Sequence, residues 1–133
     1  MNPDNKQLII DFCESWSVDW NRGDFTKPLS FFALDIVWQD MPDMRHTRNG
    51  IQACRDSLTP FIGKATDFKM NVKHVVAAGN RVMVERVDTM IYKGAENVLP
   101  VAGIFELEDG KIKVWRDYFD MKMFTDQVPA SAS

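Results

Sequence analysis

The sequence predicts an α+β fold in which a curled antiparallel sheet packs against about three N-terminal helices. Two observations support this prediction. Apolar residues at helical spacing are concentrated in the first half of the chain, and four long β segments joined by turn signals fill the second half. Helices and strands segregated in this way are typical of α+β domains, in which the helices cover one face of the sheet.

The first half of the chain contains three predicted helices and one predicted strand. Residues 4–21 carry apolar side chains at helical spacing, and Gly23 suits a left-handed cap just beyond that helix. A short helix is expected over 25–32, a strand over 33–40, a polar loop over 41–50 and a third helix over 49–62.

The second half is predicted to be a β meander, with strands over 66–78, 81–93, 96–108 and 111–122. The turn signals are Gly79-Asn80, Gly94 and Asp109-Gly110, and such short connections imply antiparallel pairing. We therefore expect one domain over 1–133, with a disordered or loosely packed tail from about 125 to 133.

Composition narrows the possible functions. A net charge of -3 argues against a dedicated nucleic-acid binder. No apolar run approaches the ~20 residues of a membrane span, and the N-terminus lacks the features of a signal peptide, so we expect a cytoplasmic protein without membrane contact. Cys13 and Cys54 are expected to be buried thiols, and no Cys or His cluster has metal-ligand spacing, so neither a metal nor a cofactor is expected.

Charged side chains interrupt the apolar faces of the predicted strands. Arg86 and Asp88 share a face with Val82 and Val84, and Asp117 lies between Trp115 and Phe119. The same alternation places His74 beside Phe68 and Met70. In 33–40 it places Leu34, Trp38 and Asp40 on one apolar face. A buried carboxylate must be paired, and the planar fork of Arg86 is suited to hold both Asp88 and Asp117.

Such a triad has a chemical consequence. One guanidinium compensates one negative charge, so two carboxylates in a dry pocket keep one proton between them. The result is a general acid beside a general base, which suits the addition of water to a strained ether. The alternative is a structural ion pair that fixes the strand register.

The remaining polar positions have two interpretations each. His74 is either a satisfied core histidine or part of the pocket, and Asp40 is either a solvated loop end or a pocket residue. Solvated loop positions are expected for Arg45, His46 and Arg48. The predicted pocket wall would accommodate a bulky apolar substrate, and it consists of Trp115, Phe119, Met70 and Phe68.

Two segments, VERVDTM at 84–90 and GKIKVWRDYFDM at 110–121, resemble the limonene-1,2-epoxide hydrolase family. VWQDMP at 37–42 is similar to its third active-site segment. That family belongs to the nuclear-transport-factor-2-like, cystatin-like cone folds, together with ketosteroid isomerase and the SnoaL-like polyketide cyclases. The resemblance implies that Asp88 protonates the epoxide oxygen, Asp117 activates water and Arg86 bridges them. It also implies a one-step hydrolysis without metal, cofactor or covalent intermediate.

The resemblance also implies how the water is held and how the chain assembles. The family positions its water with a Tyr and an Asn, which correspond here to Trp38 and Asp40. Asp40 adds a negative charge, so either it is protonated, or a cation such as His74 or a loop arginine lies nearby, or the water is held differently. A homodimer is expected through the outer face of the sheet, where apolar surface is predicted at Val75, Val87, Tyr92 and Ile104.

Two other functions remain open from the sequence. One is an acid–base enzyme similar to ketosteroid isomerase or to polyketide cyclases, with Asp40 as its base. The other is a non-catalytic module that binds a small molecule.

Overall fold

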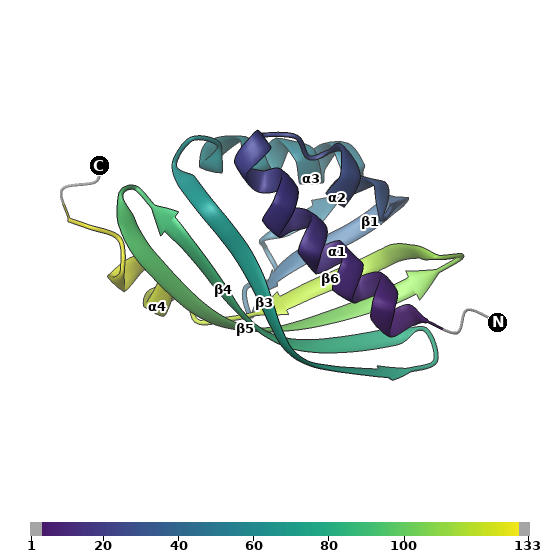
Figure 1. Ribbon diagram of the computed structural model, residues 1–133. Coiled ribbons are helices and arrows are strands. Elements are labelled where there is room, and N and C mark those ends of the chain that lie inside the picture. The colour runs from purple at the N-terminus through teal and green to yellow at the C-terminus, as the bar shows by residue number, and fades with distance from the viewer. Residues whose placement is uncertain (1–3, 131–133) are drawn as a thin grey trace.

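The fold is built on one six-stranded, strongly curled sheet with the strand order β2-β1-β6-β5-β4-β3 (Figure 1). The computed structural model describes residues 4–130. The strands are β1 Phe32–Met41, β2 Thr47–Asn49, β3 Ala65–Ala78, β4 Arg81–Tyr92, β5 Ala95–Glu108 and β6 Lys111–Tyr118. The helices are α1 Asn5–Asp19, α2 Thr26–Ser30, α3 Ile51–Leu58 and α4 Met121–Asp126. The predicted α+β class is confirmed.

Helix α1 lies across the inner face of the sheet, and α2 and α3 lie beside it over β1 (Figure 1). The Phe12 ring meets the rings of Phe105 and Trp115 edge-on, with centroid distances of 5.8 and 5.1 Å. The backbone N–H of Met70 donates to Oγ of Ser17 at 3.0 Å, which ties β3 to the helix. Gly23 has the predicted left-handed conformation, with φ +67°. The core therefore lies between α1 and the inner sheet face.

The four predicted meander strands pair antiparallel as expected, from β3 to β6. The sequence did not predict how β1 joins them, and in the structure β1 pairs with β6 in parallel. Their register places Trp38 opposite Trp115 and Asp40 opposite Asp117. Paired positions on neighbouring strands are about 5 Å apart and point to the same face. This parallel pair therefore brings two distant segments together on the inner face.

Two segments differ from the prediction. The expected polar loop at 41–50 contains strand β2, which pairs with β1. The end of the last predicted strand and the start of the expected tail form helix α4, whose first turn is capped by the Asp120 side chain. The Gln127 side chain then bonds to both the N–H and the C=O of Val98. The tail prediction is thus wrong for its first residues, and 131–133 lie outside the described residues.

Register shifts change which side chains face inward. The β3–β4 register shifts between Val72 and His74, so His74 points to solvent, with 80% of its side chain exposed. The pairing of β1 with β6 shifts between Phe32 and Val37, and Leu34 is 86% exposed. Because side chains alternate with period two, a one-residue slip moves every following side chain to the other face. The predicted inward positions of His74 and Leu34 are therefore wrong.

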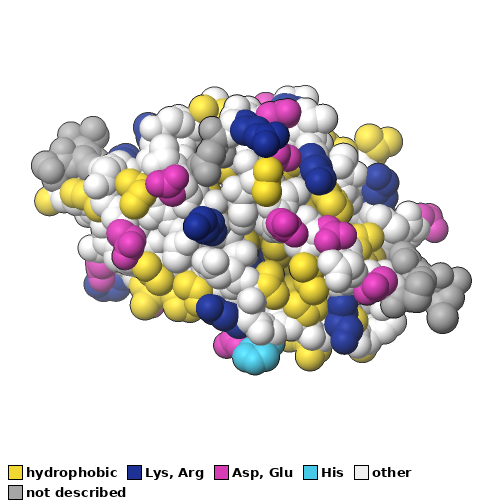
Figure 2. All heavy atoms as spheres, in the orientation of Figure 1, with side chains coloured by type: hydrophobic (Ala, Val, Ile, Leu, Met, Phe, Trp, Pro, Cys, Tyr) yellow, Lys and Arg dark blue, Asp and Glu magenta, His cyan; other side chains and the backbone are white. Residues whose placement is uncertain are grey.

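The structure also corrects part of the expected dimer surface. Val75 and Tyr92 pack against the core cluster and so belong to the inner side, not to the outer face. On the face seen in Figure 2, charges of both signs are interspersed with hydrophobic side chains. Among residues 4–130, none of the helices has the length and apolarity needed to cross a membrane.

Two truncations on β1 test which of its side chains point into the core. Ile36 is fully buried, so Ile36→Ala is expected to lower the free energy of unfolding by about 2–5 kcal/mol. Leu34→Ala, at an exposed position, is expected to change it by less than about 0.5 kcal/mol. Urea unfolding of both variants measures the difference. Equal losses would contradict the register of this strand.

Candidate active site

A cavity of about 160 Å³ lies between the helices and the inner face of the sheet. Its wall is mostly apolar and aromatic, and includes residues of α1, α3, α4 and all six strands. The apolar lining is Trp16, Trp20, Trp38, Leu58, Phe61, Ala65, Phe68, Met70, Met90, Leu99, Val101, Trp115, Phe119 and Phe124. The charged lining is Asp40, Arg48, Arg86, Asp88 and Asp117. Concave apolar pockets with a few convergent polar groups are typical binding sites.

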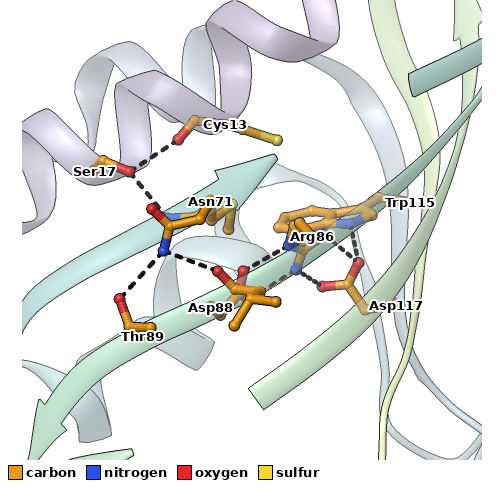
Figure 3. A network of polar contacts seen from close by, with 10 residues as sticks. Cys13, Ser17, Asn71, Arg86, Asp88, Thr89, Trp115 and Asp117 are labelled. Atoms are coloured by element: carbon orange, nitrogen blue, oxygen red, sulfur yellow. Dashed lines mark hydrogen bonds and ion pairs between the residues drawn. The ribbon is translucent and has the colours of Figure 1, made fainter. Parts of the chain in front are cut away.

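Arg86 lies at the centre of the charged group, between two carboxylates (Figure 3). Its Nε and Nη2 donate to the two oxygens of Asp88 at 2.8 and 3.1 Å. Its Nη1 and Nη2 donate to the two oxygens of Asp117 at 2.9 and 2.6 Å. Arg86 is 1% exposed, and both aspartates are buried. One guanidinium therefore makes two bidentate ion pairs away from solvent.

Trp115 and Gly103 both shape the surroundings of Asp117. Trp115 Nε1 donates to Oδ1 of Asp117 at 2.6 Å, so three donors point at this carboxylate in all. Gly103 on β5 leaves the space that the triad occupies. A Cβ at that position would lie 2.8 Å from Nη1 of Arg86 and 3.0 Å from Oδ1 of Asp117. The close approach of these groups thus depends on a glycine in the middle of a strand.

The two carboxylates differ in their surroundings. Burial raises the pKa of Asp88 above its ordinary value, although Arg86 acts in the opposite direction, and Asp117 adds to the rise. Burial acts to lower the pKa of Arg86, but the two carboxylates outweigh it and raise that pKa well above the ordinary value. Asp117 accepts three hydrogen bonds, whereas Asp88 accepts two. Arg86 is therefore a permanent cation, and Asp88 is the carboxyl that burial drives toward its neutral form.

A second ion pair lies in the same cavity. Arg48 Nη2 donates to Oδ2 of Asp40 at 2.8 Å, and the Arg48 guanidinium lies 4.0 Å from the ring centroid of Trp38. On its other side, Trp38 stacks on Trp115 with a centroid distance of 4.3 Å and an interplanar angle of 6°. A loop arginine is one of the cations that the sequence suggested for Asp40. Arg48 is therefore a pocket residue, and the expectation that it is solvated is wrong.

The structure gathers nearly all of the predicted site residues around one cavity. Arg86, Asp88 and Asp117 meet as expected, Trp38 and Asp40 lie beside them, and the four predicted wall residues line the cavity. His74 does not take part, because its Nδ1 contacts Oε1 of Glu85 at 2.7 Å on the exposed side of the sheet. Within residues 4–130 no group of three or more His, Cys, Asp or Glu is arranged to hold a metal ion.

Sequence reasoning missed several residues of the site. Gly103 had a usable signal, since an isolated glycine inside a strand pattern often marks a close approach. Trp16 and Trp20 were visible only as apolar positions of the first helix. Arg48 had no clear signal, because its place depends on the pairing of β2 with β1 across a short turn.

Fold and site together define a class of protein, the nuclear-transport-factor-2-like cone domains with charged groups inside an apolar pocket. The family model of the limonene-1,2-epoxide hydrolase catalytic domain matches residues 21–129. The chain therefore belongs to the limonene-1,2-epoxide hydrolase catalytic domain family.

Similar proteins agree with this assignment. Epoxide hydrolase EphG of Mycobacterium tuberculosis is 39% identical over 54 residues, which span 41% of this chain and 36% of EphG. The structure of an LEH-like epoxide hydrolase from M. tuberculosis has a TM-score of 0.73 at 25% identity, covering 91% of this chain and 89% of that chain. A SnoaL-like protein from Shewanella putrefaciens has a TM-score of 0.79 at 17% identity, covering 94% and 96%, and shows the fold alone.

The requirement for Gly103 is tested by adding one methyl group. Gly103→Ala places a Cβ against Arg86 and Asp117, so the free energy of unfolding is expected to fall by about 1–3 kcal/mol. Ala102→Ser, at the neighbouring exposed position, serves as the control and should change stability by less than about 0.5 kcal/mol. Chemical denaturation of both variants is the measurement. A Gly103→Ala protein as stable as the wild type would show that the triad does not need this space.

Proposed function

We propose that this protein hydrates an apolar epoxide to a vicinal diol in one step, with Asp88, Arg86 and Asp117 as its catalytic triad. The observation that carries the proposal is the double bidentate pairing of buried Arg86 with two carboxylates that line an apolar cavity. One cation compensates one of the two negative charges. The neutral arrangement holds one proton, which makes an acid and a base available side by side.

The proposed reaction uses both groups at once. Asp117 takes a proton from a water molecule as the water oxygen forms a bond to one epoxide carbon. The bond between that carbon and the epoxide oxygen breaks, and Asp88 donates its proton to the departing oxygen. Asp117 has then gained one proton and Asp88 has lost one, so proton transfer back to Asp88 completes the cycle. Arg86 remains charged throughout and balances whichever carboxylate is ionised.

The surroundings of the two carboxylates support these roles. Burial raises the pKa of Asp88, which favours the protonated form that an acid needs. Asp117 accepts hydrogen bonds from Arg86 and Trp115, which fix the orientation of the carboxylate proposed to act as the base. Asp40 is the register partner of Asp117 on the neighbouring strand, and both carboxylates line the cavity, which supports a water held between them. Trp38, next to Asp40 in the wall, is the second residue proposed to position this water or the substrate.

The wall of the cavity supports an apolar substrate. Aromatic and aliphatic side chains surround the triad, and the only charged lining residues among those described are the three carboxylates and two arginines already named. Burial of a terpenoid-like ring against Phe68, Met70 and Phe119 would contribute about 25 cal/mol for each Å² removed from water. Such a wall orients the epoxide by shape and leaves the polar contacts to the triad.

The other functions have weaker support. In a reaction like that of ketosteroid isomerase, Asp40 would be the base, but its Oδ2 is occupied by Arg48. A non-catalytic binding module would use the triad as a structural ion pair only. Asp88→Asn separates these cases. A purely structural partner should lose the ~3–5 kcal/mol of stability that breaking a buried pair costs, whereas a catalytic acid should lose turnover with a smaller loss of stability.

The proposal is tested by diol formation from a panel of cyclic and terpenoid epoxides. Asp117→Asn and Asp88→Asn are each expected to lower kcat by about 10²–10⁴-fold, the usual contribution of a general base or acid. The free energy of unfolding should change by less than the ~3–5 kcal/mol of a broken buried pair. Gas chromatography of the diol and thermal unfolding are the two measurements.

Asp109→Asn is the matched control, because Asp109 is exposed in the β5–β6 turn at φ +51°, a conformation that Asn also tolerates. It should keep full activity. If folded wild-type protein formed no diol from any epoxide, or if Asp117→Asn retained full turnover, the proposed hydrolase function would be wrong.

A further inference from the structure

The second ion pair of the cavity is held in place from three sides. Arg48 is the register partner of Trp38 across the β1–β2 pair, its Nη2 donates to Asp40, and its guanidinium carbon lies 4.0 Å from the ring centroid of Trp38. Its side chain is 19% exposed, whereas Arg45 on the preceding loop is 90% exposed. Arg48 Nη1 is buried, and no residue within 4–130 accepts a hydrogen bond from it. Arg48 is therefore built into the cavity wall.

The charge of Asp40 makes this pair important for the triad. Asp40 lies next to Asp117 in the sheet register, so its carboxylate faces the same cavity. With Asp40 ionised and unpaired, three carboxylates would face Arg86 alone, and the cavity would be neutral only with two protons. Arg48 supplies the second positive charge, so three carboxylates and two guanidinium groups are neutral with a single proton.

The other titratable groups near the cavity leave this balance unchanged. On α1, burial raises the pKa of Cys13 to about 12, and on α3 burial raises the pKa of Cys54 to about 11, so both are neutral thiols. His46 and Arg45 contact Asp43 in the exposed loop after β1. On α4, Lys122 and Asp126 pair with each other at the surface, and on β6 and β5 Arg116 pairs with Glu106.

We propose that Arg48 is a positioning residue for epoxide hydration: it holds the Asp40 carboxylate as a second acceptor for the attacking water and cancels its charge. The inference rests on the proposed hydrolase function. The triad then holds one proton, so that one carboxyl group acts as the acid and the other as the base. Asp40 takes the place of a neutral water-binding group only because Arg48 accompanies it.

This role predicts opposite effects from removing the two partners. Without Arg48, the extra negative charge of Asp40 makes the cavity hold protons to higher pH. Without the Asp40 carboxylate, the extra positive charge of Arg48 makes the cavity release them at lower pH. Removing both charges restores the balance. A merely structural ion pair would lower activity or stability in each variant without moving the titration in opposite directions.

The first experiment is the pH dependence of kcat/KM for diol formation, which reports the ionisations of the free enzyme. Arg48→Met is expected to move the whole profile up by about one pH unit, and Asp40→Asn to move it down by about as much. The double variant Arg48→Met, Asp40→Asn should return the profile to the wild-type position. The conservative variant Arg48→Lys should keep it there. Arg45→Met and Asp43→Asn, which remove the exposed pair of the neighbouring loop, should leave the profile unmoved.

The second experiment is the pH dependence of the unfolding temperature, which needs no substrate. Because the pKa of Asp88 is raised in the folded state, this carboxyl contributes stability that is fully present below the ordinary pKa of about 3.9 and lost as pH rises through the folded pKa. Relative to the matched controls, Arg48→Met should move this loss to higher pH and Asp40→Asn to lower pH.

The two experiments separate the two proposals. If wild-type protein hydrates no epoxide, the hydrolase function fails, and the unfolding curves still decide whether Arg48 sets the charge balance. If both single variants shift the curves in the same direction, or shift neither, the role of Arg48 is wrong even in an active hydrolase.

Discussion

The ion pairing of Arg86 with Asp88 and Asp117 is the interaction on which the rest of this structure depends. An unpaired ion removed from water costs several kcal/mol, so a guanidinium this deeply buried requires partners that reach it on both sides. Asp88 is two residues along the same strand, whereas Asp117 comes from β6, with β5 between the two strands. Each of the three strands therefore has to hold its register for the charges to meet.

Several local features follow from this requirement. Gly103 on the intervening strand carries no side chain, which lets the guanidinium and the Asp117 carboxylate pass over β5. Trp115 supports Asp117 with its indole N–H and packs on Phe105 of β5 and Phe12 of α1. Trp115 thus takes part both in the aromatic packing of the core and in the hydrogen bonding of the triad. The helix α1 covers the assembly and excludes solvent, which strengthens every electrostatic interaction beneath it.

The parallel pair of β1 and β6 extends the site beyond the triad. It stacks Trp38 on Trp115 and places Asp40 beside Asp117, and β2 then adds Arg48 on the outer side of Trp38. Arg48, Trp38 and Trp115 therefore lie in contact one after the other, and Trp115 touches the triad. Where the family resemblance implies a neutral water-binding pair, this chain has a charged residue together with its own counter-charge.

Much of this arrangement was predictable from local patterns. Alternation within strands identified Arg86, Asp88 and Asp117 as charged residues on apolar faces, and the need to pair buried charges predicted their contact. His74 and Leu34 were misplaced because each lies where the strand pairing shifts register, and such shifts have no reliable signal in a single sequence. Arg48 and the parallel pairing of β1 depend on contacts between distant segments, which local patterns do not encode. Helix α4 was missed because its short sequence continues a strand-like alternation.

The central claim is that Arg86 leaves one proton on the two triad carboxylates, and that Asp88 carries it. Infrared spectroscopy detects this proton directly, because a protonated carboxyl absorbs apart from a carboxylate. At about pH 6, about two units above the ordinary aspartate pKa, the wild-type protein should show a protonated-carboxyl band that is absent from Asp88→Asn. The same band in Asp88→Asn, or no such band in the wild type, would contradict the claim.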